Sequence, residues 1–91
     1  MNKKDLSGSK VLVIGGAGFI GSFVVGELLK SPVAEVVIYD NFTRGKMTNL
    51  TPHLSDPRCS IYPNGGDIRD IDLLNDAMKG IDYVIHLAAM W

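Results

Sequence analysis

Four glycines stand among seven residues in the segment GGAGFIG, which runs from Gly15 to Gly21. Gly16, Gly18 and Gly21 fit the spacing G-x-G-x-x-G, and a start at Gly15 fits G-x-x-G-x-x-G. In such a turn the early glycines allow a sharp bend, the middle one lets a phosphate approach the backbone, and the last lets a helix pack close to a strand. The first N–H groups of that helix also attract an anion. The segment therefore predicts a phosphate-binding turn.

An acidic residue follows at a distance that suits a nucleotide. Asp40 lies nineteen residues beyond Gly21, directly after the apolar run VAEVVIY. A carboxylate at this place accepts hydrogen bonds from ribose hydroxyls, and it repels the 2′-phosphate of NADP, which favours NAD. Arg44 lies four residues further on, and because an arginine there can accommodate the 2′-phosphate, NADP stays an alternative. The alternative interpretation is that Asp40 is a solvated or capping residue at a strand end.

Two other nucleotide sites fit the same residues less well. A phosphate loop of the form G-x-x-x-x-G-K-[ST] would use Gly16 and Gly21, but Ser22 stands where the lysine is required. A methyl-donor turn of the form G-x-G-x-G needs glycine in place of Ile20, although it also uses an acid after the second strand. The phosphate loop is excluded, and the methyl-donor turn stays open as the poorer fit.

The segments around the glycines indicate alternating strands and helices. The apolar run before the turn is short and rich in β-branched residues, which is typical of a buried parallel strand. After the turn, Ile20, Phe23, Val24 and Leu28 recur at helical spacing until Pro32. We expect strands over 10–14, 33–39, 59–62 and 81–87, helices over 18–30 and 71–78, and a short helix within 46–54 that Pro52 interrupts.

This order of elements predicts the fold class. Asp70 can cap the helix expected over 71–78, and Lys79 and Gly80 suit its end. Parallel strands joined by right-handed helical crossovers give an α/β Rossmann-type sheet. We therefore expect a partial parallel sheet of about four strands in the order 3-2-1-4, with helices on both faces.

Composition limits the classes of function. The chain has 91 residues, a net charge of −1 and no low-complexity tract, so we expect one domain, 1–91, without a basic surface for nucleic acid. Cys59 is the only cysteine, which rules out an internal disulfide and favours a reducing compartment. Neither a membrane-spanning run nor a signal-peptide core is present in the sequence. The expected location is the cytoplasm, away from membranes.

Four segments together resemble a known family. They are GGAGFIGS (15–22), DNFTRG (40–45), GDIRD (66–70) and HLAA (86–89), and each comes at a suitable strand end. In this order they are similar to the cofactor-binding segments of extended short-chain dehydrogenases/reductases, in particular the NAD-dependent epimerase/dehydratase group. The resemblance implies an NAD site made of Gly15, Gly18, Phe19, Ile20, Gly21, Asp40, Asn41, Asp67, Ile68, Leu87, Ala88 and Ala89.

Within that site the resemblance gives each segment a part of the cofactor. Phe19 and Ile20 would approach the pyrophosphate, and 40–41 the adenosine ribose. The pair 67–68 would approach the adenine, and 87–89 the centre of the cofactor. Each assignment has a structural alternative: the acid at 67 could cap a turn after two glycines, and the alanines at 88 and 89 could be small because helices crowd them.

The chain departs from this family in its catalytic residues. Members use a Tyr-x-x-x-Lys pair, but here the residues four positions after the three tyrosines are Thr43, Gly66 and Leu87. His86 is expected to be a packed, hydrogen-bonded strand residue rather than a base. We assign no catalytic and no metal-binding residue, and expect the 91 residues alone to be inactive.

Three functions therefore stay open. The first is the NAD-binding N-terminal part of a sugar-nucleotide epimerase or dehydratase, a family of oxidoreductases whose substrate would bind only to the full-length parent. The second is a stand-alone nucleotide-binding module without chemistry, and the third is a truncated structural or interaction fragment. In each case we expect the strand over 81–87 to leave an edge unpaired, so that the chain is marginally stable or self-associates there.

Overall fold

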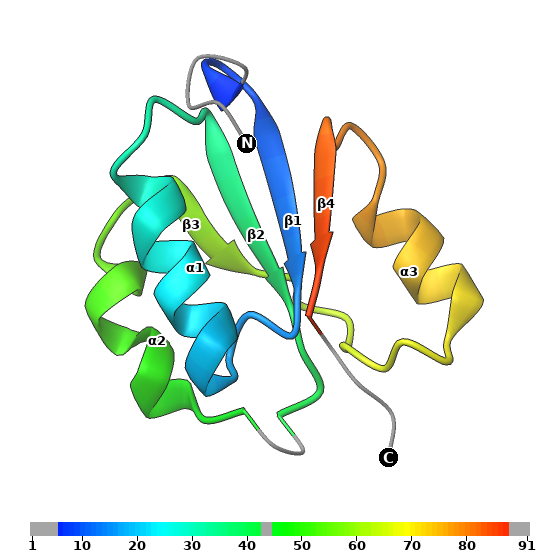
Figure 1. The fold of residues 1–91 in the computed structure, drawn as a ribbon. Helices are drawn as coiled ribbons and strands as arrows, with labels where there is room; N and C mark the ends of the chain where they lie inside the picture. Colours follow the sequence, from blue (N-terminus) through cyan, green and yellow to red (C-terminus); the bar gives the residue numbers. More distant parts are fainter. Residues whose placement is uncertain (1–5, 43–44, 88–91) are drawn as a thin grey trace.

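A four-stranded parallel sheet forms the centre of the computed structural model, which describes residues 6–42 and 45–87 (Figure 1). The strand order is β3-β2-β1-β4, which confirms the predicted order 3-2-1-4. Within these residues no helix has the length and apolar character needed to cross a lipid bilayer. In chain order the elements are β1 (Lys10–Ile14), α1 (Phe19–Leu29), β2 (Glu35–Tyr39), α2 (Met47–Leu54), β3 (Cys59–Ile61), α3 (Ile71–Ala77) and β4 (Tyr83–His86).

Helices cover both faces of the sheet, as predicted. In Figure 1, α1 and α2 lie on one side of the strands and α3 lies on the other. Alternate residues of β1 point to opposite faces, so Val11 and Val13 pack in the core under α1 and α2, whereas Leu12 and Ile14 pack on the side of α3. All four are buried, which explains why the strand reads as an unbroken apolar run.

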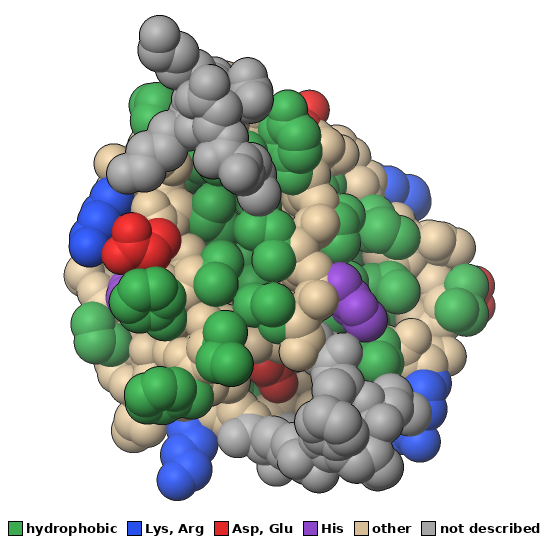
Figure 2. All heavy atoms as spheres, viewed as in Figure 1, with side chains coloured by type: hydrophobic (Ala, Val, Ile, Leu, Met, Phe, Trp, Pro, Cys, Tyr) green, Lys and Arg blue, Asp and Glu red, His purple; other side chains and the backbone are tan. Residues whose placement is uncertain are grey.

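The residues that α1 buries against the sheet are not all those that the apolar spacing in the sequence indicated. Ile20 and Phe23 are 68% and 67% exposed, while Gly21, Val25 and Leu28 face the core. Gly21 lies so close to the preceding turn that it fixes the rotation of the helix about its axis. Residues four and seven positions later then meet the sheet, and hydrophobic side chains remain on the outer surface seen in Figure 2.

Pro52 does not interrupt α2, contrary to expectation. The helix continues from Met47 to Leu54 with Pro52 inside it. A proline removes the amide that would bond to the carbonyl four residues earlier, here that of Thr48. The Thr51 hydroxyl donates to this carbonyl at 3.0 Å, so the carbonyl keeps a partner and the helix continues.

α3 begins and ends where the sequence predicted. The Asp70 carboxylate accepts a hydrogen bond from the Leu73 amide at 3.1 Å and so caps the helix. Beyond the last turn, Gly80 takes a positive φ of 74°, a conformation that glycine adopts at no steric cost. Local side-chain chemistry therefore sets both ends of α3.

Arg58 joins the end of α1 to the start of β2, a contact that the sequence did not predict. Its guanidinium donates to the carbonyl oxygens of Leu29, Ser31 and Val33. The Asp56 carboxylate accepts from the same guanidinium at 2.7 Å, and this hydrogen bonding lowers the pKa of Asp56 to about 2. One arginine thus satisfies the last carbonyl of α1, which has no helical partner, and two carbonyls of the connection that follows it.

β4 is an edge strand that pairs only with β1 among the described residues. Tyr83 and Val84 are 40% and 44% exposed, and His86 is exposed rather than packed as expected. The reason is local: on this side of the sheet only α3 approaches, and the described residues place no other element over the strand. The unpaired edge agrees with the prediction, and self-association through it stays a prediction.

Candidate functional site

The glycine turn joins the carboxyl end of β1 to the first turn of α1, as predicted. Gly15 has φ of 86°, in the left-handed region, and its amide donates to the Tyr39 carbonyl at 2.8 Å. A Cβ added to Gly21 would stand 2.0 Å from the Gly15 carbonyl oxygen, so helix and turn touch backbone to backbone. These two glycines are required by the fold itself.

Gly18 is different, because none of the described residues requires it to be glycine. Its φ of −70° suits any residue, and a Cβ there would meet only the Gly15 carbonyl oxygen, at an ordinary 3.4 Å. The space beside its Cα is therefore open on the protein's own side. A phosphate group approaching the backbone is the kind of neighbour that would use this space.

The first turn of α1 is a candidate site for an anion. Gly18 is the N-cap and supplies no side-chain cap, and the first turn carries no acidic residue. Among the described residues, the amides of Phe19 and Ile20 have no acceptor, whereas the Ser22 amide donates to the Gly18 carbonyl at 2.8 Å. Unpaired N–H groups at the positive end of an eleven-residue helix attract phosphate.

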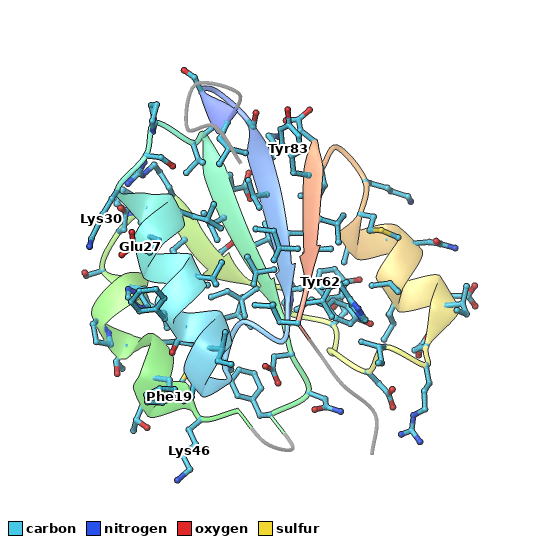
Figure 3. All side chains as sticks on the ribbon, viewed as in Figure 1. Phe19, Glu27, Lys30, Lys46, Tyr62 and Tyr83 are labelled. Atoms are coloured by element: carbon cyan, nitrogen blue, oxygen red, sulfur yellow. The ribbon has the colours of Figure 1, made fainter. Side chains whose placement is uncertain are left out.

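The side chains of this turn point away from the sheet. Figure 3 shows Phe19 at the start of α1, with Glu27 and Lys30 further along the same helix. Phe19 is 87% exposed. The two residues predicted to approach a pyrophosphate can therefore offer it their backbone amides, while their side chains lie on the outer surface.

Asp40 lies beside the glycine turn, at the end of β2. Its Oδ2 accepts from the Ala17 amide at 3.0 Å and its Oδ1 accepts from the Phe42 amide at 2.7 Å. Phe42 has a φ of 62°, a conformation uncommon for a residue other than glycine. The carboxylate is thus a capping group as well as a candidate ligand. A carboxylate has about four lone-pair positions, so two backbone donors leave acceptor capacity for hydroxyl groups.

The loop after β3 is packed against the same end of β2. A Cβ on Gly66 would stand 2.1 Å from the backbone of Asp40, so the two segments meet without side chains between them. The buried Tyr39 hydroxyl donates to the Asp67 carbonyl at 2.8 Å. These contacts bring the segments predicted to bind the ribose and the adenine together at the carboxyl end of the sheet. The sequence analysis did not predict that Tyr39 would join these two segments. The available signal was a residue with a hydroxyl group at the end of a buried strand.

Asp67 has a local partner that bears on its predicted role. Its carboxylate accepts from the Arg69 guanidinium at 2.8 and 3.0 Å and from the Arg69 amide at 2.8 Å. Hydrogen bonding from Arg69 lowers the pKa of Asp67 to about 2. The turn-capping alternative for Asp67 is therefore present in the structure, and its carboxylate stays partly exposed. Ile68 packs with Tyr39 on the α3 side of the sheet.

The last predicted segment begins beside β1. The Leu87 amide donates to the Ile14 carbonyl at 2.8 Å, and its side chain is 38% exposed. Ala88 and Ala89 lie outside the described residues, as does Arg44. Asn41 is exposed and follows Asp40 directly. The structure thus brings residues from 15–21, 40–41, 66–68 and 87 to the carboxyl ends of the strands, where ligands of open α/β sheets bind.

Comparison with known proteins identifies a family. The model of the NAD dependent epimerase/dehydratase family matches residues 11–91. A UDP-glucose 4-epimerase of Rickettsia bellii is 33% identical over 84 residues, which cover 88% of this chain and 24% of that protein. A dTDP-glucose 4,6-dehydratase of Streptomyces niveus is 41% identical over 86 residues, 88% of this chain and 25% of that protein.

A solved structure has the same fold at similar sequence identity. The Bordetella bronchiseptica enzyme WbmF, in complex with NAD+ and UDP, superposes with a TM-score of 0.80 and 34% identity, over 99% of this chain and 25% of that one. The chain therefore spans about a quarter of the length of the proteins it matches.

Proposed function

Because this chain belongs to the NAD-dependent epimerase/dehydratase family, we propose that it binds NAD at the carboxyl end of its sheet. The pyrophosphate would accept hydrogen bonds from the amides of Phe19 and Ile20, beside the open Cα of Gly18. The observation that carries the proposal is the pair of unpaired amides at the start of α1, next to a carboxylate fixed on the Ala17 amide at 3.0 Å.

The rest of the cofactor would follow the edge of the sheet. Asp40 and Asn41 would bind the adenosine ribose, and the Asp40 charge would disfavour the 2′-phosphate of NADP. Asp67 and Ile68 would border the adenine, with Arg69 orienting the Asp67 carboxylate by two hydrogen bonds. Leu87, with the alanines at 88 and 89, would contact the centre of the cofactor.

The contribution of this chain is binding and orientation. When bound, NAD supplies hydride transfer at its nicotinamide. Because no Tyr-x-x-x-Lys pair occurs in the 91 residues, we propose that they form the N-terminal NAD-binding domain of an epimerase or dehydratase of nucleotide sugars, and that they bind the cofactor without turnover. A nucleotide-sugar substrate is consistent with the relatives' names and with the UDP bound to WbmF.

Gly18→Ala tests the phosphate site with little effect on the fold. An added Cβ has room in the protein but would occupy the approach to the amides, so NAD affinity measured by calorimetry should fall by tenfold or more while the melting temperature changes little. Gly26→Ala is the matched control in the same helix, where a Cβ meets only the end of the His53 ring, and it should bind NAD normally. Wild-type protein should prefer NAD to NADP.

Two outcomes would contradict the proposal. Equal NAD affinity of the two glycine variants would mean that the pyrophosphate does not lie at Gly18. No heat from NAD or NADP at millimolar concentration would mean that the 91 residues do not bind a dinucleotide. The first result would place the dinucleotide elsewhere on the chain, and the second would favour a structural or interaction fragment.

A further inference from the structure

Both the N–H and the C=O of Ala17 form hydrogen bonds to residues that are distant in the sequence. The Ala17 amide donates to Asp40 Oδ2 at 3.0 Å. Its carbonyl oxygen accepts two hydrogen bonds from the region of α2, one from the Asn49 Nδ2 at 2.9 Å and one from the Lys46 amide at 3.1 Å. Ala17 is fully buried, so water does not compete for these groups.

These bonds determine the orientation of the peptides that precede the free amides. The next amide along the chain, that of Gly18, donates to the Gly15 carbonyl at 3.2 Å. Two consecutive peptide planes are thus fixed, and the unpaired N–H groups of Phe19 and Ile20 follow immediately. The Ala17 carbonyl and the Gly18 N–H belong to one planar peptide group, so a rotation of the carbonyl would turn the Gly18 N–H with it.

We propose that Asn49 is a positioning residue for the dinucleotide site, acting through the Ala17 carbonyl. This inference rests on the proposed function, because the amides that Asn49 positions are those proposed to bind the pyrophosphate. Asn49 itself lies on α2 and acts on the site only through the turn. The residue keeps the turn in the form that points the amides of Phe19 and Ile20 toward an anion.

The amino-acid type at position 49 supports this role. Asn49 lies in the first turn of α2, where an Asn side chain commonly bonds to backbone groups of its own helix end. Here the side chain leaves its own helix and reaches a carbonyl thirty-two residues away in sequence. Gly45 allows the approach, since a Cβ there would stand 2.6 Å from the Ala17 Cβ. The loop after β2 is therefore shaped to bring Asn49 to the glycine turn.

The decisive variant is Asn49→Leu, measured in the full chain. Leucine has the same number and branching of side-chain heavy atoms and a higher helix propensity, so the melting temperature should hold or rise while the amide donor is lost. We expect NAD to bind about tenfold more weakly, the effect of one hydrogen bond. Asn49→Gln keeps a donor and should bind within threefold of wild type. The control is Ser55→Ala, which removes an exposed 3.1 Å hydrogen bond, to the Pro52 carbonyl, at the end of the same helix.

A second measurement separates this inference from the proposed function. Hydrogen exchange of the Gly18 amide, followed by NMR without cofactor, reads the order of the turn directly. Exchange should be faster in Asn49→Leu than in Ser55→Ala. If wild type binds no dinucleotide, the proposed function fails, and faster exchange still supports the positioning of the turn. Unchanged exchange in Asn49→Leu, or undiminished NAD binding in a wild type that binds, would overturn the inference.

Discussion

The two sides of β1 are held in different ways. On the side of β2, the strand end is joined to its surroundings through Asp40, Tyr39 and Gly66, and the neighbouring strand is buried. On the side of β4, the strand is exposed and bonds to β1 alone within the described part of the chain. Within the described residues, the chain thus makes more contacts of its own beside the adenosine half of the proposed cofactor site than beside β4.

The difference has a simple physical origin. Beside the carboxyl ends of β1 and β2, backbone segments lie very close together, because glycines at 21, 45 and 66 leave no room for a Cβ. Such contacts are stiff, since backbone atoms cannot change rotamer to relieve a clash. Around β4, contacts are made by side chains that remain partly in water. We therefore expect substitutions near β2 to have larger effects than matched substitutions in β4.

The largest expected effect comes from Gly21→Val. A Cβ at this position would lie 2.0 Å from the Gly15 carbonyl oxygen, so the helix must move away from the turn. We expect a loss of at least about 3 kcal/mol in the free energy of unfolding, which for a chain of this size can abolish folding at 37 °C. Circular dichroism melts measure it. A Gly21→Val variant as stable as Gly26→Ala would show that the tight contact is unimportant.

A matched pair of valines compares the two sides directly. Val36 in β2 is fully buried, and Val84 in β4 is 44% exposed, although both strands pair with β1. Val36→Ala should cost about 2 kcal/mol and lower the melting temperature by roughly 10 °C. Val84→Ala should cost less than about 1 kcal/mol. Equal losses would mean that β4 is as firmly held as β2, contrary to the comparison.

The sequence predicted the fold well because its signals were local. Short apolar runs and the glycine spacing located β1 and the turn, and Asp70 located the start of α3, since each depends on neighbours in the chain. The register of α1 was not predictable in the same way. Its buried face is decided by the backbone contact of Gly21 with Gly15, and hydrophobic spacing alone favoured Ile20 and Phe23.

The candidate site was predictable only in part. Asp40 and the glycine turn follow a spacing that reflects one βαβ unit, so sequence reasoning could pair them. Asn49, Arg58 and the Tyr39 hydroxyl make contacts between segments that lie about thirty residues apart. No local pattern encodes those pairs, because the fold must form before either partner has a neighbour.

The smallest expected effect is the loss of stability at low pH, which compares two Asp–Arg ion pairs. Asp56 is bonded to Arg58, which holds three carbonyls between α1 and β2, whereas Asp67 is bonded to Arg69, an exposed neighbour. The pKa of each carboxyl is about 2, below the ordinary 3.8, so the unfolded chain takes up protons first as the pH falls. Their stabilisation is complete above about pH 4 and is lost between about pH 4 and pH 2.

Melting temperatures of Asp56→Asn and Asp67→Asn across that pH range distinguish the two pairs. Asp56→Asn should lower the melting temperature at pH 7 by a few degrees and flatten its fall toward pH 2, because Arg58 would lose the partner that orients it. Asp67→Asn should change the melting temperature less, since an exposed local pair contributes little to stability. If Asp67→Asn were the more damaging, the loop at 65–70 would depend on its ion pair more than the junction of α1 and β2 does, contrary to the expected order of the two pairs.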